Sequence, residues 1–350
     1  MFVPPRCPNV RCPMHAEPRA GFYRHKGYYQ PKCRPHPVPR FKCRACNRGF
    51  SRQTFRMDYY DHKPHLNTLL MRLLCNGSGL RKAARFIAMT KNNTEAKFRK
   101  IGRHCRRLNV HLRQPLGERV RLQFDEFETY EGRRSTRPVT LPMAIERDSR
   151  LLLYARAAPI RPSGPMPEHR RRAIAQDERR YRPRRSRSSR ACTVVLGVAS
   201  RMCAKAKSVL LETDRKSTYP AIARRLFGER LVHSRTPSRV PRYAWNPLFP
   251  INHSEAIARD LNGRLRRESW LVSKKLRFLN LQLAIYAAFR NFAQPRFNRD
   301  KQSPAQFAGW MPRMLSAGDV LSWRQVFGRL SGHPLARNGE AIEDFVSQSS

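Results

Sequence analysis

Acidic residues are scarce in this chain: its 350 residues include 25 Asp and Glu against 71 Lys and Arg, which gives a formal net charge of +46. A surplus of this size repels itself and is tolerated mainly where a polyanion neutralises it. Arg outnumbers Lys and is the better bidentate ligand for phosphate, so we expect a nucleic-acid partner. Charge alone does not separate a DNA-binding protein from a structural RNA-binding protein.

The chain also lacks an apolar run of about 18 residues, so the sequence predicts no membrane span. The stretch from Met1 to Cys7 has no apolar signal-peptide core, and we expect a cytoplasmic protein that joins the nucleoid when bound to DNA. Nine cysteines, an odd number, argue against a disulfide framework. A hydrophobic content of 40% allows real cores, and the length predicts about two domains.

Four cysteines near the N-terminus fall into two closely spaced pairs. They are Cys7 with Cys12, then Cys43 with Cys46. Such spacing lets two turns present four thiolates to one Zn²⁺, and the aromatic and basic stretches between the pairs suit the strands of a zinc ribbon. Residues 1–60 are too few and too polar to fold on burial alone, so zinc is expected to stabilise them. Because the first pair has the wider gap, Cys33 and His36 are alternative ligands.

Residues 61–115 show helical apolar spacing interrupted by turns. We expect helices over 65–74, 80–88 and 95–101, with a break at 92–94. Two helices joined by a turn, with basic residues on the last helix, predict a helix-turn-helix DNA-binding segment. The alternative is a plain helical linker with a solvated basic face. The residues predicted to contact DNA are Arg81, Lys82, Lys97, Arg99 and Lys100.

The few acids that fall within β-like runs are informative. Residues 118–158 contain three such runs joined by charged turns, which predict a β-meander with Asp125 in its first strand. A fourth buried-strand pattern ends in Asp214, and a helix over 220–227 and a short strand over 230–233 follow it. Acids on the first and fourth strands can lie side by side and hold two divalent ions. The alternative is that both are ordinary strand-end acids paired with Arg.

The order of these parts resembles that of small bacterial insertion-sequence transposases of the DDE class. The stretch 246–275 strengthens the resemblance, because its R-x-x-x-x-R-L-x-R-type run ends near Ser273 and Lys274 as it does in the acid-bearing region of the family. The resemblance covers roughly residues 5–292. It implies an α/β fold with an RNase H-like mixed-sheet catalytic domain, in which three acids bind Mg²⁺ or Mn²⁺.

The resemblance implies that Asp125 and Asp214 are the first two metal ligands. The third acid of the family falls at Asn252 here, and Glu255 lies three residues later, in the expected first turn of a helix capped by the serine before it. Three alternatives are open: Glu255 is the third ligand, Asn252 or His253 replaces it, or this copy is catalytically impaired.

The expected organisation has five parts. They are a zinc ribbon at 1–60, a helix-turn-helix segment at 61–115, a catalytic domain at 116–292, an Arg-rich insertion within it at 159–190, and a C-terminal tail at 293–350 with no assigned role. The insertion carries eleven Arg. It is expected either to bind DNA with a steep salt dependence or to be a solvated disordered segment. Arg264, Arg267 and Lys274 are expected to flank the DNA.

Together these features predict a transposase that acts on double-stranded DNA, both the element ends and the target. Water would first free a 3′-OH, which would then attack the target strand without a covalent enzyme intermediate. A homo-oligomer is expected because two DNA ends must be joined. Two rival functions are a non-catalytic zinc-ribbon DNA-binding regulator, including a degenerate transposase, and a structural RNA-binding protein.

Overall fold

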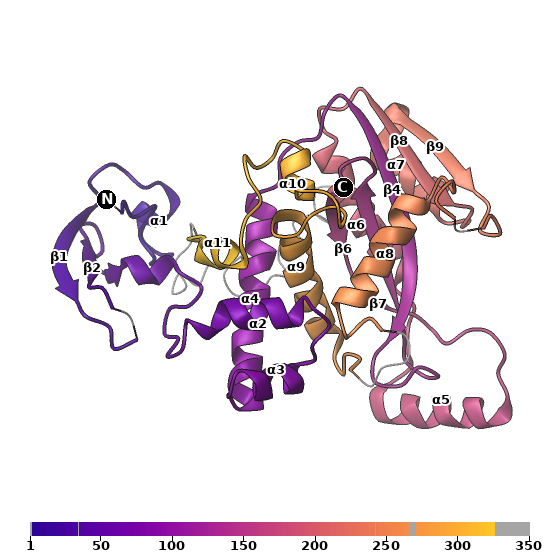
Figure 1. Cartoon of the computed structure of the whole chain (residues 1–350), viewed down its shortest axis with the longest axis horizontal. Helices are drawn as coiled ribbons and strands as arrows, with labels where there is room; N and C mark the ends of the chain where they lie inside the picture. Colours follow the sequence, from indigo (N-terminus) through magenta and orange to yellow (C-terminus); the bar gives the residue numbers. More distant parts are fainter. Residues whose placement is uncertain (1, 34, 242, 267–270, 326–350) are drawn as a thin grey trace.

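A computed structural model describes residues 2–33, 35–241, 243–266 and 271–325 of the chain. Three parts follow one another across the molecule: a small three-stranded sheet at one end, a group of helices in the middle, and an α/β body from which one helix, α5, stands out (Figure 1).

The N-terminal part is a three-stranded antiparallel sheet in the order β1-β2-β3. Its elements are α1 (Pro13–Ala16), β1 (Tyr23–Tyr29), β2 (Val38–Cys43), β3 (Gly49–Ser51) and the 3-10 helix η1 (Arg52–Phe55). Aromatic rings fill its core, with Phe41 and Phe50 stacked 5.7 Å apart and Phe55 edge-on to Phe50. A core this small is marginal by itself, so the cysteines beside it must contribute to its stability.

Three helices follow: α2 (Leu66–Leu74), α3 (Leu80–Phe86) and α4 (Lys91–His111). The break predicted at 92–94 is wrong, because these residues form the first turn of α4. The side chain of Thr90 accepts a hydrogen bond from the backbone N–H of Asn93 at 3.3 Å and so caps the helix. The turn between α3 and α4 contains Ala88 in the left-handed conformation, with φ at 49°.

The body is built on a mixed sheet whose main path runs in the order β6-β5-β4-β8-β9, with β7 beside β5. Its strands are β4 (Arg119–Tyr130), β5 (Pro138–Glu146), β6 (Leu152–Ala155), β7 (Ala158–Pro159), β8 (Ser208–Asp214) and β9 (Leu231–Thr236). The first three form an antiparallel meander, whereas β8 runs parallel to β4 and β9 parallel to β8. The meander and the strand ending in Asp214 are confirmed, and the fold class is α/β.

Helices cover both faces of this sheet. They are α6 (Ser188–Met202) and α7 (Tyr219–Phe227) on one face, and α8 (Phe249–Leu261) and α9 (Leu276–Phe292) on the other. Side chains alternate along β4, so Leu122 and Phe124 join the core with α6 and α7 while Phe127 joins the core with α8 and α9. The helical segment predicted over 220–227 corresponds to α7, and the short strand after it to β9.

The middle helices pack into the body. Helix α4 lies against α9, where Gly102 permits a close approach: a Cβ at this position would lie 2.9 Å from Cβ of Leu281. Two short helices from the expected tail, α10 (Pro304–Phe307) and α11 (Ala317–Ser322), also contribute buried residues to this core. Of residues 293–350, positions 326–350 lie outside the described residues. No helix in the described ranges has the length and apolarity needed to cross a membrane.

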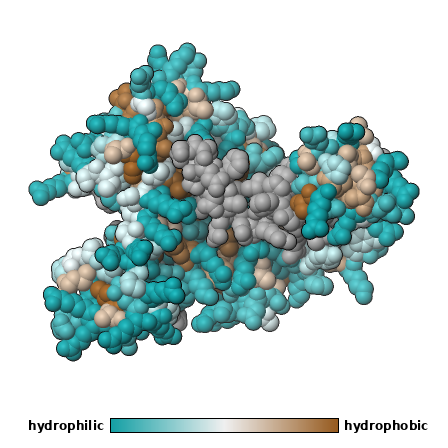
Figure 2. Space-filling view, turned by 180° about the vertical axis from the view of Figure 1, so that it is seen from behind, coloured by the Kyte–Doolittle hydropathy of each residue, from teal (hydrophilic) through white to brown (hydrophobic). Residues whose placement is uncertain are grey.

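Helix α5 (Glu168–Tyr181) extends from the body as an arm, and none of its residues is buried. Glu131 anchors the base of the arm, since Arg137 and Arg184 both pair with its carboxylate, at 3.1 and 3.3 Å. Seen from behind, the arm is a mostly hydrophilic lobe at the lower left (Figure 2). The Arg-rich insertion at 159–190 contains this helix, and its last residues begin α6.

Candidate active site and metal centre

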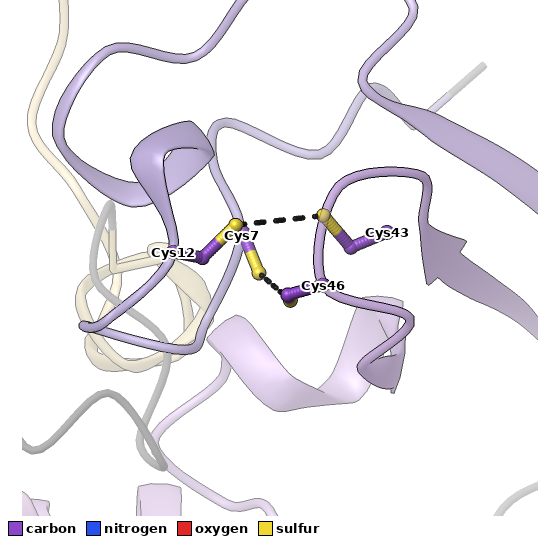
Figure 3. A group of neighbouring side chains, drawn as sticks. All are labelled: Cys7, Cys12, Cys43 and Cys46. Carbon is purple, nitrogen blue, oxygen red and sulfur yellow. Dashed lines mark hydrogen bonds between the residues drawn. The ribbon is translucent and has the colours of Figure 1, made fainter.

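The four paired cysteines form a cluster that can hold a metal ion (Figure 3). Their sulfur atoms all lie within 4.8 Å of one another. Sγ of Cys7 lies 3.5 Å from Sγ of Cys46, and Sγ of Cys12 lies 3.8 Å from Sγ of Cys43. Four sulfurs placed tetrahedrally around Zn²⁺ at about 2.3 Å would be about 3.8 Å apart. The cluster therefore fits a structural metal such as zinc.

Local geometry explains how these sulfurs converge. Cys43 ends β2, and the tight turn after it closes when the N–H of Asn47 donates to the Cys43 carbonyl at 3.1 Å. Asn47 has a φ of 57°, a left-handed conformation that Asn tolerates better than most residues. The alternative ligands Cys33 and His36 are both exposed and lie outside the cluster, so the structure does not support them.

The predicted acids come together in one cleft of the body. A cavity of about 980 Å³ is lined by residues from β4, the end of β8, and α8. Its lining includes Asp125, Asp214, Asn252 and Glu255. All four candidate residues therefore face the same space, although they lie up to 130 positions apart in the sequence (125 to 255).

Strand pairing brings the two aspartates together. Gln123 of β4 is paired with Glu212 of β8 in a parallel register, so Asp125 and Asp214, two residues further along each strand, lie beside each other on the same face. They lie toward the carboxyl ends of the parallel strands, the edge at which open α/β sheets usually bind ligands.

A buried glutamine attaches α8 to this face of the sheet. The side-chain amide of Gln123 donates to the Pro247 carbonyl at 2.7 Å, and its oxygen accepts from the N–H of Ile251 at 2.8 Å. The same amide group also donates to Glu212 at 3.0 Å, and Arg147 binds that carboxylate from the other side at 2.8 Å. These bonds fix the first turn of α8 over the cleft, so Gln123 is a positioning residue that the sequence did not single out.

Helix α8 presents one polar face to the cleft, formed by Asn252, Glu255 and Arg259 at helical spacing. The predicted helix start is wrong: α8 begins at Phe249, and the hydroxyl of Ser254 donates to the Pro250 carbonyl at 2.8 Å. Glu255 is therefore buried in the second turn instead of lying in the first.

The imidazole of His253 points elsewhere. Its ring stacks on Phe249 at 5.6 Å and lies 6.1 Å from the ring of Phe297. Of the alternatives for a third ligand, the structure therefore brings Glu255 and Asn252 to the cleft, and it places His253 in an aromatic cluster.

A second carboxylate on β4 was missed by the sequence analysis. Glu126 points to the opposite face of the sheet, where Lys216, Thr140 and Ser188 donate to its oxygens at 2.5, 2.6 and 2.7 Å. Tyr219 donates to it as well, at 3.0 Å. Burial by itself raises the pKa of Glu126, but the hydrogen bonds outweigh burial and lower the pKa to about 2. Glu126 therefore stays ionised and ties β4 to the loop after Asp214.

Most residues predicted to contact DNA are accessible. Arg81, Lys82, Arg99 and Lys274 are exposed, and Lys100 is half-exposed. Arg267 lies outside the described residues.

Lys97 was predicted to contact DNA, but in the structure it is buried. Its ammonium group is buried and binds the Asp61 carboxylate at 2.5 and 2.7 Å and the Asn67 side chain at 2.9 Å. Burial alone would raise the pKa of Asp61, but the hydrogen bonds from Lys97 and Asn67 hold it below its usual range. Lys97 therefore joins α4 to the segment before α2 and is not free to bind phosphate.

Arg264 also has a structural role. Its guanidinium group is half-buried, donates to the Ser273 hydroxyl at 3.0 Å, and lies 5.2 Å from the centre of the Phe98 ring. Burial lowers the pKa of Arg264 to about 10. This packing makes Arg264 a poor candidate for a DNA contact.

The chain matches no known protein-family profile and no curated protein sequence. Among the described residues, the cysteine cluster is the one group that brings three or more metal-ligand atoms within 4.8 Å of one another. The acids of the cleft, all of them described residues, do not form such a group.

Replacing Cys46 with serine should abolish stoichiometric zinc binding, because a tetrahedral site needs all four sulfurs. Zinc content measured by mass spectrometry of the purified protein checks this, and hydrogen exchange should show loss of protection in β1–β3 while the body sheet stays protected. Cys33→Ser is the matched control and should retain zinc. Equal zinc content in the two variants would contradict the assignment.

Glu126→Gln should lower the free energy of unfolding by about 1–3 kcal/mol at neutral pH, since it removes a buried charge that four groups bind. The folded pKa lies near 2 and the ordinary value is 4.5, so this stabilisation is complete above pH 4.5 and lost as the pH falls toward 2. Urea unfolding at several pH values should show the gap between wild type and variant narrowing across that window.

The matched control for this substitution is Glu118→Gln, which removes an exposed pair with Lys207. It should change stability by about 0.5 kcal/mol or less at any pH. A Glu126→Gln gap that stays constant down to pH 2 would show that the buried network does not depend on the ionised carboxylate.

Proposed function

We propose that this chain is a DNA transposase of the DDE class, in which Asp125, Asp214 and Glu255 hold two divalent metal ions. The observation that carries the proposal is the convergence of these three acids, from β4, β8 and α8, on one cleft. A soluble domain gains no stability from directing carboxylates into a shared cavity, whereas metal-dependent phosphoryl transfer requires it.

The topology of the sheet supports an RNase H-like catalytic domain. The first strand of the body, β4, lies between its antiparallel neighbour β5 and the parallel strand β8, and it carries the first acid. The second acid ends β8, and the third lies on a helix that packs across the same face. This is the arrangement implied by the family that the sequence resembles.

Carboxylate and amide oxygens are the donors that Mg²⁺ and Mn²⁺ prefer. We assign Glu255 as the third ligand because its carboxylate supplies the negative charge that two divalent ions need, while the Asn252 amide adds a neutral oxygen. Bound ions would activate the attacking oxygen and stabilise the leaving oxygen. Arg259 lies on the same helix face, where its guanidinium group donates to the Glu128 carbonyl at 3.3 Å and lies 4.5 Å from the centre of the Phe127 ring.

The reaction has two steps, both of which exchange one bond at phosphorus for another. In the first, a water oxygen bonds to phosphorus and the bond to the 3′ oxygen breaks, which leaves a 3′-OH and a 5′-phosphate. In the second, that 3′-OH attacks a target phosphodiester and displaces a new 3′-OH. The number of phosphodiesters is conserved in the second step, so no energy-rich cofactor is needed. The protein contributes positioning and charge.

The helices α3 and α4 supply a DNA-binding surface for this function. They are joined by a short turn at Ala88, and α4 carries the exposed residues Asn92 and Asn93 in its first turn and the exposed Arg99 in its third. The N-terminal residues of a recognition helix are those that reach base edges in the major groove. Arg81 and Lys82 on α3 are exposed and would contact the flanking phosphates.

The proposal is tested with purified protein, labelled duplex DNA from the flanks of its own gene, and Mg²⁺ or Mn²⁺. Wild type should nick or join strands, and Asp125→Ala, Asp214→Ala and Glu255→Gln should each reduce the rate roughly 100-fold or more. Asn252→Ala should retain more activity than Glu255→Gln, because it removes a neutral ligand. Gel electrophoresis of the labelled strands measures both steps.

Asp148→Ala is the control, since this aspartate is exposed in the turn after β5. It should cleave at the wild-type rate. Tight DNA binding without cleavage by wild type in either metal would contradict the enzymatic proposal and favour a zinc-ribbon DNA-binding regulator. Preference for RNA over duplex DNA at matched salt would favour the structural RNA-binding protein.

A further inference from the structure

A small cavity lies beside the edge strand β6, apart from the acidic cleft. Side chains from α4, α6, α9 and β6 line it, and its volume is about 50 Å³. No described residue lines both this cavity and the cleft. Val110, which belongs to the lining, is 37% exposed, so the cavity opens toward solvent. It offers about the room that two water molecules take in the liquid.

Two asparagines hold α9 at a fixed distance from β6 and so keep the cavity open. Asn291 exchanges two hydrogen bonds of 2.9 Å with the backbone of β6, and Asn280 accepts one of 2.9 Å from a backbone N–H just beyond the end of the strand. Ala284 and Ala287 lie between them on the same face of the helix and also line the cavity. Because alanine side chains are short, they do not fill the space that the asparagines set.

The lining contains a guanidinium group with no acidic partner. Arg113 follows α4, and its guanidinium group lies 5.4 Å from the centre of the Tyr154 ring of β6. None of the described carboxylates forms an ion pair with Arg113. Burial lowers the pKa of Arg113, and the positive charge of Arg201 lowers it as well. A charge withdrawn from water in this way is costly without a counterion, and a carboxylate matches the geometry of a guanidinium group.

Much of the remaining lining is apolar. It includes the buried side chains of Leu153, Val194, Val198 and Leu283. Apolar walls with a few charged or polar groups are the usual composition of a site for a small molecule. The volume admits a chain of about two or three carbon atoms next to the cation, and it excludes a long acyl chain or a nucleotide.

We propose that this cavity binds a short-chain carboxylic acid, with its carboxylate on Arg113 and its hydrocarbon chain against Ala284 and Ala287. The inference does not rest on the proposed function of the cleft, because it concerns a separate set of residues. The bound acid would contact α9, β6 and the residue that follows α4, so it would stabilise the packing of these elements.

The test follows thermal unfolding of the full-length zinc-loaded protein, without DNA or added divalent metal, in sodium salts at matched ionic strength and neutral pH. Saturating butyrate should raise the unfolding midpoint by roughly 2–5 °C over chloride, because it binds only the folded chain. Formate has no hydrocarbon chain and octanoate has one too long for the cavity, so each should give less than half of this shift. Calorimetric titration should show one butyrate site per chain.

Arg113→Met keeps most of the side-chain length and removes the charge, so it should abolish both the shift and the calorimetric signal. Arg103→Met is the matched control, because Arg103 is exposed on α4 and lies outside the cavity lining. It should keep both. Ala287→Leu fills the cavity while Arg113 remains, and it should also abolish binding.

Two results would overturn the inference. The first is an equal shift with formate and butyrate, and the second is an equal loss in the Arg103 and Arg113 variants. Either would show general anion binding by a strongly basic chain. Calorimetry compares binding directly, so it decides the question even if a variant changes the unfolding midpoint by itself. A protein that never cleaves DNA can still pass this test, and an active transposase can still fail it.

Discussion

The buried side-chain amide of Gln123 holds the candidate site together. It binds the Pro247 carbonyl just before α8 and the Ile251 N–H within the first turn of α8, and it also binds Glu212 on the neighbouring strand. Leaving such groups buried without partners would cost about 1–3 kcal/mol each, so the helix has one favoured position over the sheet. That position decides that Asn252 and Glu255, and not their neighbours on α8, face the two aspartates.

The acids inside the fold and the acids of the cleft have different surroundings. Several of the scarce acids neutralise basic groups inside the fold, as Glu126 does for Lys216, Glu212 for Arg147 and Asp61 for Lys97. The acids of the cleft instead face a cavity, surrounded by a chain whose net charge is +46. Under the proposed function, a positive surface would concentrate DNA near the protein, and the acids at its centre would mark where cations mediate contact with the phosphates.

Much of the fold could be predicted because it depends on local patterns. The β-like runs over 118–158 predicted the meander with Asp125 in its first strand, and the spacing of the cysteines predicted the metal cluster. Register between strands then placed Asp125 and Asp214 side by side, as the order of strands suggested. The start of α8 was misplaced at Ser254 although a proline in its true first turn, Pro250, was a readable signal.

Other features depend on contacts that no local pattern reveals. The bond from the Ile251 N–H to Gln123 joins residues 128 positions apart, and the partner that buries Lys97 lies 36 positions before it. Lys97 has the same local surroundings in sequence as Arg99, so only the folded chain shows that Lys97 is buried while Arg99 is exposed. The network around Glu126 was missed for the same reason, since its donors come from β5, α6, α7 and the loop before α7.

The central claim is that acids from β4, β8 and α8 bind divalent cations together, and the most direct test is anomalous X-ray diffraction from crystals of the protein soaked in Mn²⁺. The account predicts manganese peaks about 2–2.5 Å from carboxylate oxygens of Asp125, Asp214 and Glu255, and their loss in Asp214→Asn crystals under the same soak. Manganese bound elsewhere with this cleft empty, or peaks that persist in Asp214→Asn, would contradict it.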